Sequence, residues 1–189
     1  MKIAYLTSGP RGAGKTTFVS LVKQANPEVL VIDRDEIYAK EFGRSGFDSY
    51  SGMHIVAARF LREQMIEIVS SADKDAKIIV DAWNGFWNER RYFIRLLRDF
   101  GVEVVVCWYF VTPLSACLKW YMQKGLAGFS EGSCIWDYEL YHKEAEDINH
   151  PEHEIYCLEK DELDFDCSKF DMICRINPLQ LSLPNVNLV

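Results

Sequence analysis

Residues 9–17 read Gly9-Pro10-Arg11-Gly12-Ala13-Gly14-Lys15-Thr16-Thr17. This segment matches the pattern G-x-x-x-x-G-K-[ST] and follows a strand-like apolar run at residues 3–6. Glycine suits such a loop because successive main-chain N–H groups must turn inward around an anion, and a Cβ would obstruct that concavity. The sequence therefore predicts a phosphate-binding loop between a β-strand and a helix that opens at Lys15.

The loop predicts a site for a nucleoside triphosphate with Mg²⁺. Lys15 is expected to reach the β- and γ-phosphates, and the Thr16 hydroxyl is expected to ligate Mg²⁺. The predicted nucleotide-binding residues are Gly9, Gly12, Ala13, Gly14, Lys15, Thr16 and Thr17. The alternative is a glycine-rich hairpin that matches by chance. The strand-like run before the loop and the amphipathic helix after it disfavour that alternative.

Composition limits the class of protein. At 189 residues and 49% hydrophobic, the chain can bury one good core, so we expect a single domain over residues 1–189. Its 21 basic and 28 acidic residues give a net charge of −7. There is thus no global basic field to attract nucleic acid, and a polyanionic substrate would have to meet a local patch.

Six cysteines occur singly, with no C-x-x-C pair. The sequence shows no signal segment and no apolar run of about 18 residues, the length of a membrane span. These features favour buried thiols in a reducing cytoplasm, which would be the host cytoplasm for a viral protein, and they predict no membrane association.

Apolar strand-like runs alternate with amphipathic helical segments, which predicts an α/β protein with a parallel sheet. We expect strands at residues 2–7, 29–32, 77–81, 102–110, 154–158 and 171–176. We expect helices at residues 15–24, 54–70, 89–100, 113–122 and 136–147. Between the last two helices lie three glycines, which predict a small lid at about residues 119–133 that closes over phosphates.

The second strand ends in Asp33-Arg34-Asp35-Glu36. Ligands of open α/β sheets gather at the carboxyl ends of strands, so a carboxylate here can face the phosphate loop and accept a proton from an attacking hydroxyl. We assign that role to Asp35. Helix capping is the alternative, and Asp33 with Glu36 three residues later fits a capping box.

The third strand ends at Asp81, which is expected to hold the Mg²⁺ shell or the acceptor. A helix cap is again the alternative. An aromatic loop, residues 82–88, follows, and Trp83 with its neighbours could stack on a base, although core packing is the commoner role for any one of them. Arg90, near the start of the next helix, is oddly placed for the helix dipole and suggests an anion contact.

The order of these features resembles the kinase domain of phage-type polynucleotide 5′-hydroxyl kinases. The matching pieces are residues 9–17, then Arg34 and Asp35, then Asp81 with Asn84 and residues 89–91, then residues 110–125. The resemblance implies the P-loop kinase fold, with strand order 2-3-1-4-5, helices on both faces and ATP with Mg²⁺ as donor and cofactor. It implies the catalytic set Asp35, Lys15, Lys124 and Arg34. It implies an acceptor site that includes Asp81, Trp83, Asn84, Arg90 and Tyr38.

Departures from the family pattern lie on the acceptor side. Tyr38 stands where the family usually has an arginine that holds the acceptor's phosphate, and Ala82 replaces a hydroxyl residue. Lys124 stands where the family has an arginine in the lid, and no arginine occurs between Arg98 and Arg175. Lysine neutralises charge without the bidentate fork of arginine.

The acceptor is expected to be a hydroxyl of a nucleic acid, most simply a polynucleotide 5′-OH. A hydroxymethylated base in DNA, a nucleoside or nucleotide, and another small alcohol are alternatives. An ATP-binding switch or assembly module without kinase activity is the alternative from another class. The choice between ATP and GTP and the oligomeric state stay open.

Overall fold

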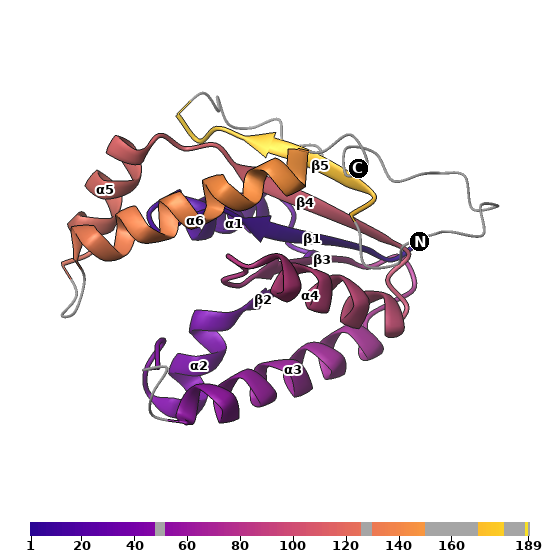
Figure 1. The fold of residues 1–189 in the computed structure, drawn as a ribbon. Coiled ribbons are helices and arrows are strands. Elements are labelled where there is room, and N and C mark those ends of the chain that lie inside the picture. Colours follow the sequence, from indigo (N-terminus) through magenta and orange to yellow (C-terminus); the bar gives the residue numbers. More distant parts are fainter. Residues whose placement is uncertain (48–51, 126–129, 150–169, 180–187, 189) are drawn as a thin grey trace.

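The computed structural model describes residues 1–47, 52–125, 130–149, 170–179 and 188 (Figure 1). The strands are β1 (Ile3–Ser8), β2 (Leu30–Asp33), β3 (Lys77–Asp81), β4 (Val104–Phe110) and β5 (Met172–Ile176). The helices are α1 (Lys15–Ala25), α2 (Arg34–Phe42), α3 (Met53–Ser71), α4 (Trp87–Asp99), α5 (Leu114–Gln123) and α6 (Glu131–Asn149).

These five strands form one parallel sheet in the order β2-β3-β1-β4-β5, which confirms the predicted order. β1 lies at the centre, where Tyr5 pairs with Ile79 of β3 and with Val106 of β4. Every residue of β1 is buried because helices cover both faces of the sheet. The carboxyl ends of β1, β2 and β3 therefore meet at one edge of the sheet, immediately before the phosphate loop, α2 and the aromatic loop.

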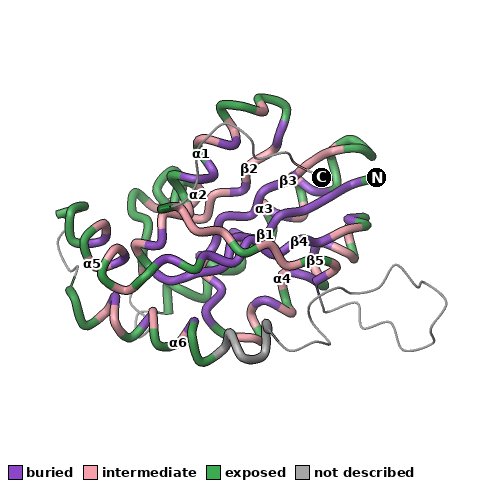
Figure 2. The backbone as a smooth tube through the Cα atoms, turned by 90° about the horizontal axis from the view of Figure 1, so that it is seen from above, coloured by how far each residue is buried: buried purple, intermediate pink, exposed green. Residues whose placement is uncertain are grey.

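Alternate residues along the strands face two separate cores. Ala4 and Leu6 of β1 pack with α2, α3 and α4, whereas Ile3 and Tyr5 pack with α1, α5 and α6. Figure 1 shows α2, α3 and α4 on one side of the sheet, and Figure 2 shows that the central strands are mostly buried. This three-layer arrangement places α2 and α6 on opposite sides of the phosphate loop.

Most predicted elements match the observed ones to within one or two residues, but α6 begins five residues earlier than expected. Its first turn is closed by Ser130, whose hydroxyl accepts a hydrogen bond from the main-chain N–H of Ser133 at 3.2 Å. The predicted strand at residues 154–158 lies outside the described residues. So does the middle of the predicted lid, residues 126–129, while the rest of that segment is largely the end of α5 and the start of α6.

Cys107, Cys117 and Cys134 are buried free thiols, and Cys174 is half-buried. Burial raises the pKa of Cys107 to about 12, so its thiol stays protonated at neutral pH. Within the described ranges, no helix combines the length and apolarity that crossing a membrane requires.

Candidate active site

The phosphate loop has the backbone that its glycines predict. Gly12 has φ +73° and Gly14 has φ +89°, in the left-handed region that side chains other than glycine rarely adopt. A Cβ on Gly12 would also lie 2.1 Å from the carbonyl oxygen of Cys117 in α5. At Gly12 the loop therefore approaches α5 so closely that only glycine fits.

Lys15 lies at the first position of α1, and its ammonium folds back over the loop. Its Nζ donates to the carbonyl oxygens of Gly9 at 2.6 Å and of Pro10 at 3.0 Å. Burial lowers the pKa of Lys15, while the carboxylates of Asp81 and Asp137 act in the opposite direction. Nζ also lies 6.0 Å from the centre of the buried Tyr141 ring. The ammonium is thus held at the mouth of the loop, where a phosphate would meet it.

Asp81 joins the phosphate loop to the end of β3. One carboxylate oxygen accepts from the Thr7 hydroxyl at 2.7 Å, and the other accepts from the Thr16 hydroxyl at 2.9 Å. Asp81 is 6% exposed, so this carboxylate is held almost entirely within the protein. A hydroxyl and a carboxylate side by side supply the hard oxygen ligands that Mg²⁺ prefers, so these two residues fit that ion. Across the described ranges, no group of three or more His, Cys, Asp or Glu residues could hold a metal by itself.

Two carboxylates at the end of β2 lie in different surroundings. Asp33 is the N-cap of α2, because its carboxylate accepts from the N–H groups of Asp35 at 2.8 Å and Glu36 at 3.1 Å. The capping alternative therefore holds for Asp33. Asp35 lies two residues later, in the first turn of α2, with its side chain 59% exposed, and its carboxylate accepts from Arg34 Nε at 2.9 Å. That leaves the carboxylate of Asp35 accessible to an incoming hydroxyl.

Electrostatic coupling places these groups in one site. Arg34 acts to lower the pKa of Lys15, and Asp81 acts to raise that of Asp33, whose pKa is raised mainly by burial. Because such interactions weaken with distance, these side chains on β2, α2, β3 and α1 lie near one another at the carboxyl edge of the sheet. Asp35 and Lys15 thus both lie at the carboxyl edge of the sheet, on helices that cover its opposite faces.

Buried side chains hold the aromatic loop after β3 in place through hydrogen bonds. Asn84 is fully buried, and its side-chain amide donates to the Thr7 carbonyl at 2.7 Å. Arg90 is also fully buried, and its guanidinium donates to the carbonyl oxygens of Asn84 at 2.9 Å and Gly85 at 3.1 Å. Trp83 is half-buried and donates its indole N–H to Asp137 at 2.7 Å. The interactions of these three side chains that the structure records fix the shape of the loop beside the site.

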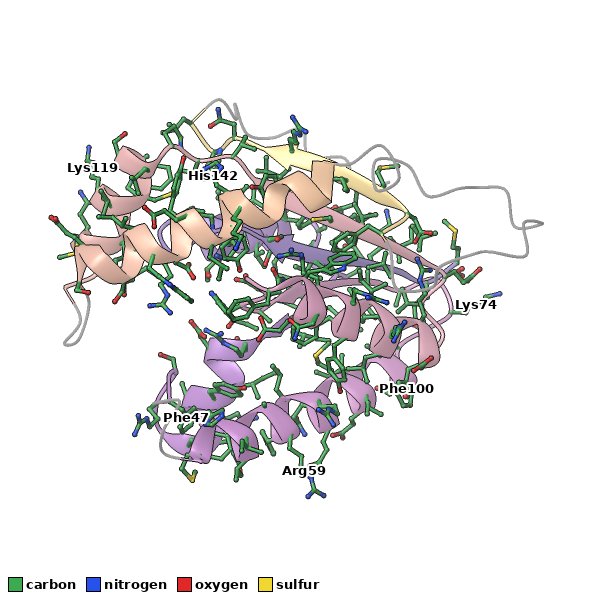
Figure 3. All side chains as sticks on the ribbon, viewed as in Figure 1. Phe47, Arg59, Lys74, Phe100, Lys119 and His142 are labelled. Atoms are coloured by element: carbon green, nitrogen blue, oxygen red, sulfur yellow. The ribbon has the colours of Figure 1, made fainter. Side chains whose placement is uncertain are left out.

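Tyr38 packs inside the lobe formed by α2 and α3. It is 8% exposed and makes edge contacts with the rings of Phe42 and Phe47, at 6.0 and 5.5 Å between ring centres. Phe47 lies beside α2 in Figure 3. The position at which the resembled kinases carry a phosphate-binding arginine is therefore part of a small aromatic core. Lys124, the expected lid cation, caps the C-terminus of α5 and is exposed.

One face of α6 contributes residues that sequence reasoning missed. Asp137 is fully buried, and its carboxylate accepts from the main-chain N–H of Arg11 at 2.7 Å as well as from Trp83. Cys134 donates its thiol to the Arg11 carbonyl at 3.6 Å, and the Tyr141 hydroxyl accepts from the N–H of Asn84 at 3.1 Å. The spacing of three and then four residues aligns them on one helical face. The sequence shows that spacing, but it does not show that this helical face contacts the phosphate loop.

Comparison with known proteins agrees with this geometry. Residues 5–133 match AAA_33, a family described as an AAA domain, and this match spans more than half of the chain. The chain belongs to the AAA_33 family. No match was found among curated proteins.

Solved structures that resemble this AAA_33 protein include the following three. The Pnkp1/Rnl/Hen1 RNA repair complex aligns with TM-score 0.65 and 13% identity over 77% of this chain and 46% of that chain. The chain thus spans less than half the length of that similar protein. A tunicamycin resistance protein from Deinococcus radiodurans aligns with TM-score 0.53 and 18% identity over 75% of this chain and 81% of that one. A proposed kinase from Chloroflexus aurantiacus aligns with TM-score 0.55 and 13% identity over 95% of this chain and 91% of that chain.

At these identities the likeness concerns the fold. Together with the strand order and the phosphate loop, it shows that this AAA_33 protein has the P-loop kinase fold.

Proposed function

We propose that this protein transfers the γ-phosphoryl group of ATP to a hydroxyl of a nucleic acid, most simply a polynucleotide 5′-OH. The observation that carries the proposal is the placement of Asp35 beyond β2, on the same edge of the sheet as Lys15 and the Asp81–Thr16 pair. A phosphate cradle faced by an accessible carboxylate is what direct transfer to an alcohol needs.

Each group has a defined part in this reaction. Main-chain N–H groups of the loop and the ammonium of Lys15 hold the donor phosphates. Asp35 accepts the proton of the acceptor hydroxyl as that oxygen attacks the γ-phosphorus, and Arg34 orients the Asp35 carboxylate through its hydrogen bond. Thr16 and Asp81 would hold Mg²⁺, which neutralises charge on the phosphate oxygens when bound. Lys124 would add positive charge from the end of α5.

The acceptor is the part of the proposal that the geometry constrains least. Arg90 and Asn84 are buried against the carbonyl oxygens of their own loop, and Tyr38 lies in the aromatic core of the α2–α3 lobe. These observations favour, as a second candidate, an acceptor without a neighbouring phosphate, such as a hydroxymethylated base, a nucleoside or another small alcohol. Trp83 would then serve as a wall of the acceptor site through the part of its ring that is exposed.

An acceptor panel tests the proposal. Transfer of radiolabelled γ-phosphate should be measured side by side to a 5′-OH oligonucleotide, to DNA with a hydroxymethylated base and to nucleosides. Product on the oligonucleotide 5′ end supports the first candidate, and product on the other acceptors alone moves the assignment to the second. ADP release without a labelled product from any acceptor would instead identify an ATP-hydrolysing switch or assembly module.

Two variants connect that activity to the site. Lys15→Ala should abolish transfer, because it removes the ammonium from the mouth of the loop. Asp35→Asn should lose about 10²-fold or more in turnover while ATP affinity survives, because Asp35 acts only on the acceptor. The exposed Asp99 at the end of α4 is a matched control, and Asp99→Asn should keep full turnover. Unchanged turnover in Asp35→Asn would disqualify it as the base.

A further inference from the structure

Arg11 is an arginine within the phosphate loop itself, two residues after Gly9. Its neighbours Pro10 and Ala13 are buried, but its own side chain is 43% exposed. A long cationic side chain therefore leaves the loop at a point where the surrounding backbone is closely packed.

The backbone of Arg11 is fixed on two sides while its guanidinium is not. The main-chain N–H donates to Asp137, and the main-chain carbonyl accepts from Cys134. The guanidinium has only a long ion pair, 3.9 Å from Nε to Asp137. Its two terminal nitrogens make no hydrogen bond to any residue within the described ranges. The structure thus holds the base of this side chain rigidly and leaves its fork available.

Arg11 also borders a shallow hollow. Its other walls come from the start of α6, where Ser130, Gly132, Ser133 and Trp136 lie. Asp137, which lies beside Nε of Arg11, also acts on the pKa of Lys15, so the guanidinium and the Lys15 ammonium lie near the same carboxylate. The Asp137 carboxylate beside Nε keeps a positive charge favourable there in the absence of an anion.

The other arginines near the site are committed elsewhere. Arg34 donates from both Nε and a terminal nitrogen to Asp35, and Arg90 donates to carbonyl oxygens beneath the aromatic loop. The segment from 99 to 174, which includes the whole predicted lid, contains no arginine. A loose phosphoryl-transfer transition state spreads charge over three oxygens, and a guanidinium fork matches that arrangement better than the point charge of Lys124.

We propose that Arg11 is a catalytic residue whose guanidinium contacts the γ-phosphoryl group during transfer, supplying from the phosphate loop the arginine that the lid lacks. This inference rests on the proposed function. In the step, the acceptor oxygen forms a bond to the γ-phosphorus as the bond from that phosphorus to the β–γ bridging oxygen breaks. ADP leaves, and the hydroxyl proton passes to Asp35. Arg11 exchanges no proton and stabilises the oxygens of the phosphoryl group.

The test compares Arg11→Ala and Arg11→Lys with the wild type. Its matched control is Arg95→Ala, which removes an exposed arginine from α4, away from the loop. ATP hydrolysis without acceptor gives turnover, and titration with a fluorescent ADP analogue, with and without aluminium fluoride, gives affinity for the ground state and for a transition-state mimic. Because the recorded backbone contacts of Arg11 use main-chain atoms, the alanine variant should keep its fold and its thermal midpoint.

We expect Arg11→Ala to lose about 10²–10³-fold in turnover and a similar factor in affinity for the aluminium fluoride complex, with ADP affinity within about threefold of the wild type. Arg11→Lys should recover only part of the loss, and millimolar guanidinium ion should restore turnover to Arg11→Ala but not to Lys15→Ala. A structural defect would not respond to guanidinium.

Three results would overturn the assignment. The first is wild-type turnover in Arg11→Ala, and the second is an equal loss of affinity for ADP and for its aluminium fluoride complex in that variant. The third is a wild-type protein whose affinity for ADP does not increase when aluminium fluoride is present. The acceptor panel separates this test from the proposed function. A wild type that hydrolyses ATP and labels no acceptor refutes the kinase proposal, while the fluoride and guanidinium measurements still decide the role of Arg11.

Discussion

Replacing Asp81 should separate stability from activity, because this carboxylate is buried between two threonine hydroxyls. It accepts from Thr7 at 2.7 Å, where Thr7 is fully buried, and from Thr16 at 2.9 Å, where Thr16 is exposed. A hydrogen bond to a charged group contributes about 1.5–3 kcal/mol, and water replaces much of the contribution at the exposed threonine. Asp81→Ala should therefore lower the free energy of unfolding by about 2–4 kcal/mol.

Asp81→Asn should behave differently. The asparagine oxygen can accept from one hydroxyl, and its NH₂ group can donate to the other after that hydroxyl rotates, so both threonines keep a partner. The change also removes a negative charge that opposes ionisation of Asp33. The free energy of unfolding should stay within about 1 kcal/mol of the wild type, while turnover that depends on Mg²⁺ falls about 10²-fold or more because a neutral amide is a poorer ligand.

Urea denaturation and ATP turnover across a magnesium titration measure the two effects, with Asp99→Asn as the matched surface control. Asp81→Asn with turnover within threefold of the wild type and an unchanged magnesium midpoint would refute the role of this carboxylate at the metal site. Equal destabilisation by alanine and asparagine would refute the hydrogen-bond argument.

Two further predictions follow from the loop and from the cap of α2. Gly12→Ala should abolish nucleotide binding in a fluorescence titration, because its Cβ would lie 2.1 Å from the Cys117 carbonyl oxygen and its φ is +73°; binding at wild-type affinity would show that the loop can relax around a side chain. Burial raises the pKa of Asp33, so the folded state binds its proton more tightly than the unfolded chain does, and stability falls as the pH rises through that carboxyl's titration. Asp33→Asn keeps an N-cap residue but removes the titrating carboxyl. Denaturation at a series of pH values should show that stability no longer falls through this titration in the variant. An identical pH dependence of stability in both proteins would contradict the assignment of that fall to Asp33.

The sheet and the donor half of the candidate site were predictable from local patterns. Continuous apolar runs such as residues 77–81 indicate strands buried on both faces, and the phosphate loop requires glycines at positions that the chain itself displays. At the end of β2, the capping alternative is confirmed for Asp33, and Asp35 lies beyond it with an exposed side chain. The roles of Asp35, Arg34 and Lys124 in transfer stay predictions.

The acceptor side was less predictable because identical residue types can face either way. Asn84 and Arg90 are polar residues after a strand end, a pattern typical of a binding loop, yet both are fully buried with hydrogen bonds to main-chain carbonyls. Tyr38 likewise lies in an aromatic cluster that brings together Phe42 and Phe47. Which way a side chain turns depends on neighbours that are distant along the chain.

By itself, the sequence determined the parallel sheet and the loop that can hold a phosphate, because alternation, apolar runs and glycine spacing act through neighbouring residues. Only the tertiary structure decided what surrounds that loop. Asp137 lies 126 residues from Arg11, and no local pattern links them, yet packing of α6 against the sheet brings the buried carboxylate to the Arg11 N–H. That packing fixes the backbone of the loop and leaves one guanidinium exposed beside it.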